Sequence, residues 1–193
     1  LTLWPPGKYV VELRHKDFQV GKTEVEGRLW KKGAANVVLI PDHGFVRVQG
    51  VPPDTKVTLS RKGADFSGEN PLVREVRLGI GPLKVTLQHP RFQTWQKEME
   101  IFPGKHHILR PTLQPRLGTL QFVGLHPQTE FLLRSLDPMW KDNQGRVDEG
   151  KKNVPIGRYQ LSLSRNGYFP YRRIVDVKEN QSLVVKATLS SLE

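Results

Sequence analysis

The sequence predicts an all-β protein of tandem small antiparallel β-sandwiches, the first of which is only half present. A strand–turn–strand unit occurs three times, and many short runs alternate between apolar and polar residues. Glycine and proline, with 17 and 15 residues, bound nearly every run. The apolar spacing of an amphipathic helix is missing from the sequence, so we expect a small sandwich or partly open barrel of about six or seven strands per complete repeat.

The repeated unit consists of a glycine, an alternating strand and an aromatic residue after the next turn. The copies begin at Gly7, Gly81 and Gly157, which are 74 and 76 positions apart, and the aromatic positions are Phe18, Phe92 and Tyr168. A period this long predicts a small domain copied in tandem. We expect the glycines to adopt positive φ or to allow a close approach. The alternating side chains should face a core, and the aromatic residues should close one end of the sandwich.

Two complete repeats are predicted at residues 44–115 and 116–193. They open alike, with Phe-Val-Arg-Val at 45–48 and Thr-Leu-Gln-Phe at 119–122, and each closes with Thr-Leu. Proline-bearing junctions of about four residues separate the units, which predicts semi-rigid linkers.

Residues 1–43 match only the C-terminal half of a β-sandwich repeat. Half a sandwich leaves an open sheet edge and an uncovered face. Strands upstream of residue 1, packing on the second repeat or strands from another chain could each complete it. The first residue is Leu and not Met, so we interpret the sequence as a processed or excised fragment.

Composition limits the classes of function. The chain has no cysteine, which excludes disulfides, thiolate catalysis and cysteine-based zinc sites. No apolar run is long enough for a transmembrane helix. The net charge is +11, and each of the three segments contributes to it, so an anionic partner is physically favoured, although a generally basic surface explains the same charge.

The turns of the chain share a set of glycine- and proline-bearing motifs: Gly-Val-Pro-Pro at 50–53, Gly-Glu-Asn-Pro-Leu at 68–72, Gly-Leu-His-Pro at 124–127, Val-Pro-Ile-Gly-Arg-Tyr at 154–159 and Pro-Pro-Gly-Lys-Tyr at 5–9. With these motifs the chain resembles the PEGA domain, a bacterial β-sandwich module similar to prealbumin-like and immunoglobulin-like sandwiches. The namesake tetrapeptide is replaced in both complete repeats, and the third repeat has a longer insert at 137–152. The resemblance implies a non-catalytic, extracytoplasmic module of the bacterial periplasm or cell surface.

No motif predicts catalysis, a cofactor or a metal site. Gly21-Lys22-Thr23 lacks the earlier glycine and the strand-to-helix context of a phosphate loop. The polar segment 142–149 misses the spacing of a calcium loop, and we interpret it as an exposed flexible insert. His106 and His107 are adjacent in an alternating strand, so they should point to opposite faces and cannot easily share a metal ion.

The best candidate for a partner-binding surface is the hairpin at residues 165–173. It combines aromatic and arginine side chains, which are enriched in interface hot spots and can also stack on bases or sugars: Arg165, Tyr168, Phe169, Tyr171, Arg172 and Arg173. The alternative is that Tyr168 and Tyr171 belong to the core and that the arginines are only solvated.

Three functions are compatible with these features, and none requires a small-molecule substrate. The first is a non-catalytic scaffold or protein-interaction module in a bacterial envelope assembly. The second is a basic module that binds an anionic polymer such as peptidoglycan, lipopolysaccharide or nucleic acid. The third is a regulatory β-region of a larger kinase or hydrolase.

Overall fold

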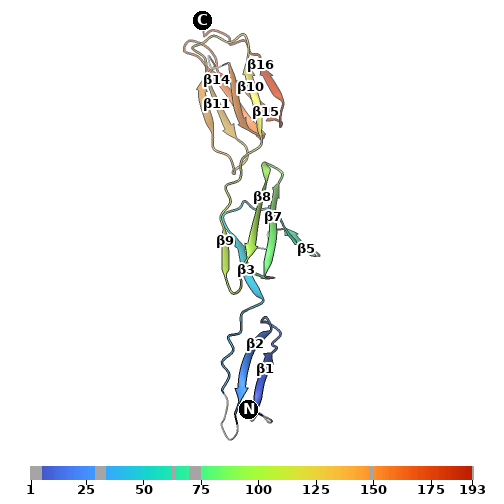
Figure 1. The fold of residues 1–193 in the computed structure, drawn as a ribbon. Coiled ribbons are helices and arrows are strands. Elements are labelled where there is room, and N and C mark those ends of the chain that lie inside the picture. The colour runs from blue at the N-terminus through green and yellow to red at the C-terminus, as the bar shows by residue number, and fades with distance from the viewer. Residues whose placement is uncertain (1–5, 29–33, 62–63, 70–74, 148–149, 193) are drawn as a thin grey trace. The chain divides into compact units, whose positions relative to one another are not determined.

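The fold is all-β, as the sequence predicts (Figure 1). The structure is a computed structural model that describes residues 6–28, 34–61, 64–69, 75–147 and 150–192. These residues contain strands and no α-helix. The chain forms two compact units, one of residues 1–89 and 94–113 and the other of residues 90–93 and 114–193.

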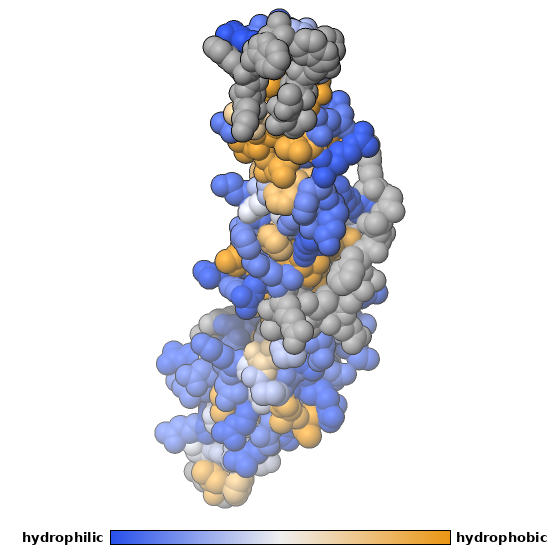
Figure 2. Space-filling view, turned by 90° about the horizontal axis from the view of Figure 1, so that it is seen from below, coloured by the Kyte–Doolittle hydropathy of each residue, from blue (hydrophilic) through white to orange (hydrophobic). Residues whose placement is uncertain are grey.

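The first unit begins with a two-stranded hairpin of β1 (Gly7–Leu13) and β2 (Gly21–Gly27). The strands are antiparallel, and Gly7 pairs with Gly27 at the open end and Leu13 with Gly21 at the turn. Val10 and Val38, on the hairpin and the segment that follows it, are exposed. Hydrophobic side chains therefore remain on the surface of this part of the chain. Figure 2 shows the hydrophobic areas of one face of the molecule in orange.

The central sandwich, β3 to β9, has two sheets. The three-stranded sheet has the order β6-β3-β9 and consists of β3 (His43–Val48), β6 (Val76–Gly79) and β9 (His106–Leu109). The four-stranded sheet has the order β5-β4-β7-β8 and consists of β4 (Lys56–Arg61), β5 (Ala64–Glu69), β7 (Gly81–His89) and β8 (Phe92–Ile101).

The C-terminal sandwich, β10 to β16, repeats this strand order. Its three-stranded sheet is β13-β10-β16, formed by β10 (Leu117–Phe122), β13 (Lys151–Pro155) and β16 (Ser182–Val185). Its four-stranded sheet is β12-β11-β14-β15, formed by β11 (Glu130–Ser135), β12 (Asn143–Arg146), β14 (Gly157–Ser164) and β15 (Tyr171–Val177).

One strand pair in each sandwich is parallel, a detail that the antiparallel prediction did not include. β3 pairs in parallel with β9, and β10 pairs in parallel with β16. The last strand of each sandwich follows a long hairpin in the opposite sheet, so it returns to the first strand by a crossover. A crossover of this kind is the connection that parallel pairing requires.

Each sandwich has its own hydrophobic core. The central core is built on β3, β4 and β7 and includes Val46, Leu59 and Val85, each nearly inaccessible to solvent. The C-terminal core includes Leu120 and Leu133 and shares no residue with the central one. These residues lie at alternate positions of their strands, as the sequence pattern predicts. Each fully buried side chain of this size stabilises the fold by about 1.5–3 kcal/mol.

Glycine is required where two backbones approach or where φ is positive. An added Cβ on Gly44 would lie 2.6 Å from the carbonyl oxygen of Phe102, and one on Gly118 would collide with the carbonyl oxygen of Lys178. The glycines that open β7 and β14 have positive φ, 112° at Gly81 and 148° at Gly157, as expected, whereas Gly7 has neither a positive φ nor an atom close to an added Cβ.

The turn of each long hairpin is hydrogen-bonded to a chain segment 21 positions later. The N–H groups of Gln19, Gln93 and Phe169 donate to the carbonyls of Ile40, Gln114 and Ser190, at 2.8, 2.8 and 2.9 Å. Isolated β-bridges at the same places join Phe18 to Pro41, Phe92 to Pro115 and Tyr168 to Ser191. The repeated aromatic residue thus lies where the outgoing segment is fixed to the hairpin turn. We call this arrangement the turn clamp.

The first turn clamp is reinforced by charge. Arg77 donates a hydrogen bond of 2.6 Å to the carboxylate of Asp17, and the Asp42 carboxylate lies 3.8 Å from the same guanidinium. The hydrogen bond from Arg77 is the main reason why the pKa of Asp17 lies below its usual value.

The insert between β11 and β13 differs from the expected flexible loop. Residues 143–146 form β12, which pairs with β11 from Glu130↔Arg146 to Leu133↔Asn143. The expectation was wrong because backbone pairing with a buried neighbouring strand stabilises a polar edge strand.

The expected Pro-Leu turn at 71–72 lies outside the described residues. The division into repeats at residues 43 and 115 stays a prediction.

Candidate functional site

The predicted partner surface begins at the turn between β14 and β15. The Tyr168 N–H donates to the carbonyl of Arg165 at 3.2 Å, and Gly167 between them has a φ of 78°. This turn brings the Arg165 guanidinium over the Tyr168 ring, 4.4 Å from its centre, in a cation–π contact. The two residues therefore form one structural group, and both are half-buried.

Phe169 is fixed in place by its backbone and exposed at its side chain. Its N–H donates to Ser190, and Leu192 donates to the carbonyl of Gly167 at 3.0 Å, so the C-terminal segment completes the third turn clamp. The Phe169 side chain is 57% exposed. A rigidly held, exposed aromatic side chain has the properties of an interface anchor.

The remaining candidates lie on β15, where side chains alternate between two faces. Tyr171 and Arg173 share the inner face with the buried Val175. Arg172 lies on the opposite, outer face. The six predicted residues thus separate into the turn group of Arg165, Tyr168 and Phe169, the inward pair of Tyr171 and Arg173, and Arg172 alone.

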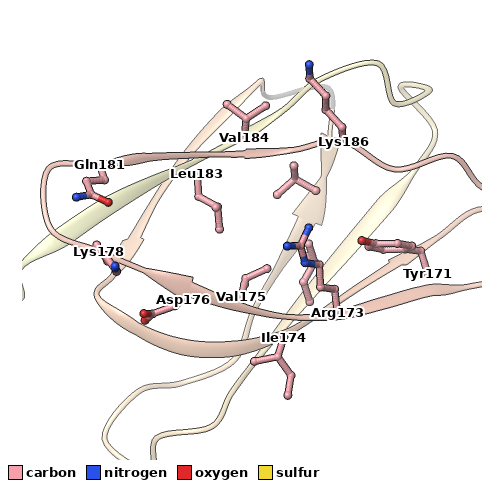
Figure 3. Close-up of a pocket in the computed structure, with 12 residues that line it drawn as sticks. Tyr171, Arg173, Ile174, Val175, Asp176, Lys178, Gln181, Leu183, Val184 and Lys186 are labelled. Carbon is pink, nitrogen blue, oxygen red and sulfur yellow. The ribbon is translucent and has the colours of Figure 1, made fainter.

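The inward pair lines a groove between β15 and β16, which we call the edge groove (Figure 3). Its volume is about 430 Å³. Arg173 and Leu183 point into it in Figure 3, whereas Ile174 and Val184 point away from its two rims. The buried side chains of Leu161, Val175 and Val185 also line it. The edge groove therefore has apolar side chains at its base and polar or charged ones around them, and the Arg173 side chain that is directed into it is exposed to solvent.

The charges around the edge groove are mostly positive. Arg173, Lys178 and Lys186 line it together with one acidic residue, Asp176. In the part of the chain that the structure describes, none of these four side chains forms an ion pair with another. The edge groove therefore offers cations to an anionic group from outside.

Sequence reasoning identified Tyr171 and Arg173 but missed the β16 side of the groove. Val184 lies in a short, ordinary strand sequence and Lys186 directly follows it, and only the parallel pairing of β10 with β16 brings this segment opposite β15. Ile174 could have been found by comparing the repeats. The position 76 residues earlier, which is Glu98, is charged, so the apolar residue at 174 is a departure from the pattern.

Among the described residues of the C-terminal sandwich, Tyr159 is a buried ionisable side chain that lies outside the edge groove. The Tyr159 hydroxyl donates to the carbonyl of Pro155 at 2.9 Å, and burial raises the pKa of this phenol to about 12. Tyr159 is therefore a neutral core residue at physiological pH. In the described residues, no group of three or more His, Asp or Glu side chains is placed to hold a metal ion.

The last strands of the chain, which build the edge groove and its turn, can be compared with known families. Residues 150–193 match the PEGA domain. This segment includes β13 to β16 and all six predicted partner residues. One PEGA domain is therefore supported, and with the strand arrangement it fits a non-catalytic, β-rich module. No curated protein matches the chain in sequence.

Two solved structures resemble the fold at low sequence identity. The Bacillus anthracis TIE protein is 16% identical with a TM-score of 0.49, and the match covers 96% of this chain and 41% of that one. GBS52, the minor pilin of the gram-positive pathogen Streptococcus agalactiae, is 9% identical with a TM-score of 0.32, over 78% of this chain and 96% of that one. The chain thus spans about two fifths of the length of the TIE protein. No helix in the described residues is long and apolar enough to cross a membrane.

Proposed function

We propose that this chain is a non-catalytic tandem β-sandwich scaffold, or protein-interaction module, of a bacterial cell-envelope protein. The observation that carries the proposal is the turn clamp, which occurs three times with the same backbone hydrogen bonds. A clamp that recurs at a fixed spacing supports a structural role, because a catalytic constellation is normally present once. The PEGA match at residues 150–193 supports a location outside the cytoplasm.

The second candidate is a module that binds an anionic polymer. The net charge of +11 and the unpaired cations around the edge groove favour it. Peptidoglycan, lipopolysaccharide and nucleic acid are the polymers that would fit this charge.

Salt dependence separates the two candidates. Binding of the 193-residue chain to peptidoglycan, lipopolysaccharide or single-stranded DNA is measured between low and physiological salt. A charge-driven module loses affinity steeply, because counterion release makes log K linear in log salt concentration. A scaffold binds these polymers weakly at physiological salt, and its protein interface tolerates salt and depends on aromatic anchors such as Phe169.

Matched charge variants complete the test. One variant replaces Arg165, Arg172 and Arg173 with Ala, and its control replaces the scattered Lys56, Lys84 and Lys105 with Ala. Isolated surface charges are screened beyond roughly 8 Å at physiological salt. If the arginines form a binding site, the lysine control should therefore weaken polymer binding less than the arginine variant does. Strong, salt-sensitive binding that only the arginine variant abolishes would overturn the scaffold in favour of the polyanion binder.

A further inference from the structure

We propose that the edge groove binds an extended peptide of a partner protein, which adds to the free edge of β16 and places an acidic side chain against Arg173. The inference rests on the proposed interaction function and names the surface and the chemistry of the partner. Four features of the described residues lead to it: free strand edges, oriented backbone groups, an unpaired inward cation and a contrast with the central sandwich.

Both strands that border the edge groove are edge strands. β15 is the last strand of the sheet β12-β11-β14-β15, and β16 is the last strand of the sheet β13-β10-β16. An edge strand has backbone donors and acceptors without a neighbouring strand, and extended peptides use such edges by adding a strand.

The hydrogen bonds of β16 show which of its backbone groups are free. The carbonyls of Gln181 and Val185 accept from Thr119 and Val123 of the neighbouring chain segment, at 2.9 and 3.1 Å. Alternate residues of a strand direct their N–H and C=O groups to opposite sides. Val184 therefore directs its N–H and C=O to the open edge, where a peptide backbone can bind them.

Arg173 determines the chemistry of the side chain that enters the groove. It points into the groove beside the apolar side chains of Leu161, Val175 and Leu183, and it is exposed to solvent, so a ligand can reach it. An inward charge on an edge strand opposes pairing with an ordinary apolar strand. A strand with a carboxylate at the matching position would instead form a charge-assisted hydrogen bond with it, which makes the edge selective.

The rims of the groove determine the alternate positions of the peptide. Ile174 and Val184 are 55% and 47% exposed and point outward. A β-branched residue next to Val184 would form a favourable cross-strand pair. The peptide should therefore alternate, with an acidic side chain facing inward and apolar side chains facing outward.

The central sandwich has the same edge with different chemistry. Its residues 76 positions earlier are Lys97 and Glu98 in place of Arg173 and Ile174, and Ile108 in place of Val184. Ile108 is also exposed, and Lys97 keeps a cation, but Glu98 puts a charge in place of the outward Ile174, so this edge lacks one of the apolar rim residues that the peptide would contact. The central edge is thus a matched control within the same chain.

The test is an NMR titration of the isotope-labelled 193-residue chain with the blocked peptide acetyl-Thr-Val-Glu-Val-Thr-amide. We expect amide shifts on β15 and β16, centred on Val184, and none around Ile108. The peptide with Gln in place of Glu should bind on the order of tenfold more weakly, because it loses the charge-assisted hydrogen bond. Arg173→Gln should remove this preference for Glu.

A proline substitution tests the backbone contact. Val184→Pro removes the free N–H, and proline is tolerated on an edge strand, so the fold should survive while peptide binding is lost. Ile108→Pro is the control and should leave binding unchanged. If Val184→Pro unfolds, the inference is still tested by comparing how the Glu and Gln peptides bind to the unsubstituted chain and to Arg173→Gln.

Three results with the peptides would overturn the inference. They are equal binding of the Glu and Gln peptides, shifts that do not involve β16, and the absence of shifts at millimolar peptide. The last result leaves the scaffold proposal standing, because another surface can hold a partner. Tight, salt-sensitive binding of oligothymidylate that survives Val184→Pro would overturn both in favour of a polyanion-binding module.

Discussion

Gly44 and Gly118 occupy corresponding positions where the first strand of a sandwich passes close to another backbone. We predict that Gly44→Ala or Gly118→Ala destabilises its own sandwich by about 1–3 kcal/mol, because the added methyl group meets a carbonyl oxygen that cannot move freely. Chemical denaturation followed by NMR provides the measurement.

Gly7→Ala is the matched control for these two substitutions. A Cβ at Gly7 has no atom within 4 Å, so stability should change by less than about 0.5 kcal/mol. Equal effects at all three glycines would show that the loss of backbone flexibility, and not the close approach, is responsible.

Tyr159 predicts an alkaline limit to the stability of the C-terminal sandwich. Burial raises its pKa from 10 to about 12, so the folded state holds the phenol proton more tightly than the unfolded state does. The contribution is complete below about pH 10 and is lost as the pH rises through 10 towards 12. The unfolding midpoint should fall over this window. In Tyr159→Phe the alkaline decrease should become smaller, and an unchanged decrease would assign it to other groups.

The side chains of the edge groove show how far the sequence could predict a site. Tyr171 and Arg173 were found because aromatic residues and arginines cluster on one hairpin. That β15 directs Arg173 inward and Arg172 outward also follows from alternation. Val184 could not be found in this way, because its place beside β15 depends on pairing between segments more than 60 residues apart in the sequence.

At the scale of elements, the N-terminal hairpin is the smallest sheet of the described structure. β1 and β2 form a two-stranded sheet, whereas the corresponding strands of the two sandwiches belong to four-stranded sheets. An isolated two-stranded hairpin is marginally stable in water. We predict that a peptide of residues 1–43 alone is unfolded, with amide shifts in the random-coil range. Cooperative thermal unfolding of this peptide as a monomer would contradict the interpretation as half a sandwich.

The strands themselves were largely predictable, and their pairing was only partly so. Alternation located β3, β4, β7 and β14 because each has one face in a core. β12 was missed because Asn143–Arg146 is polar on both faces and is stabilised by backbone pairing with β11. The parallel pairs were missed because strand direction depends on the chain path and not on side-chain periodicity.

At the scale of the whole molecule, the two sandwiches have separate hydrophobic cores, and no residue belongs to both. Stability should therefore be local to each sandwich, and unfolding should not be two-state across the chain. Leu133→Ala, at a fully buried position, should cost about 2–5 kcal/mol and accelerate amide exchange in β10–β16 only. Leu59→Ala should do the same in β3–β9 only.

The double variant tests this independence directly. If the cores are independent, the effects of Leu133→Ala and Leu59→Ala should add within about 0.5 kcal/mol, because the two side chains share no packing partners. Hydrogen exchange should then show two unfolding free energies, each lowered by its own substitution. If either single substitution accelerates exchange in both sandwiches equally, the chain unfolds as one cooperative unit. A scaffold whose modules unfold independently can lose one module and keep the other.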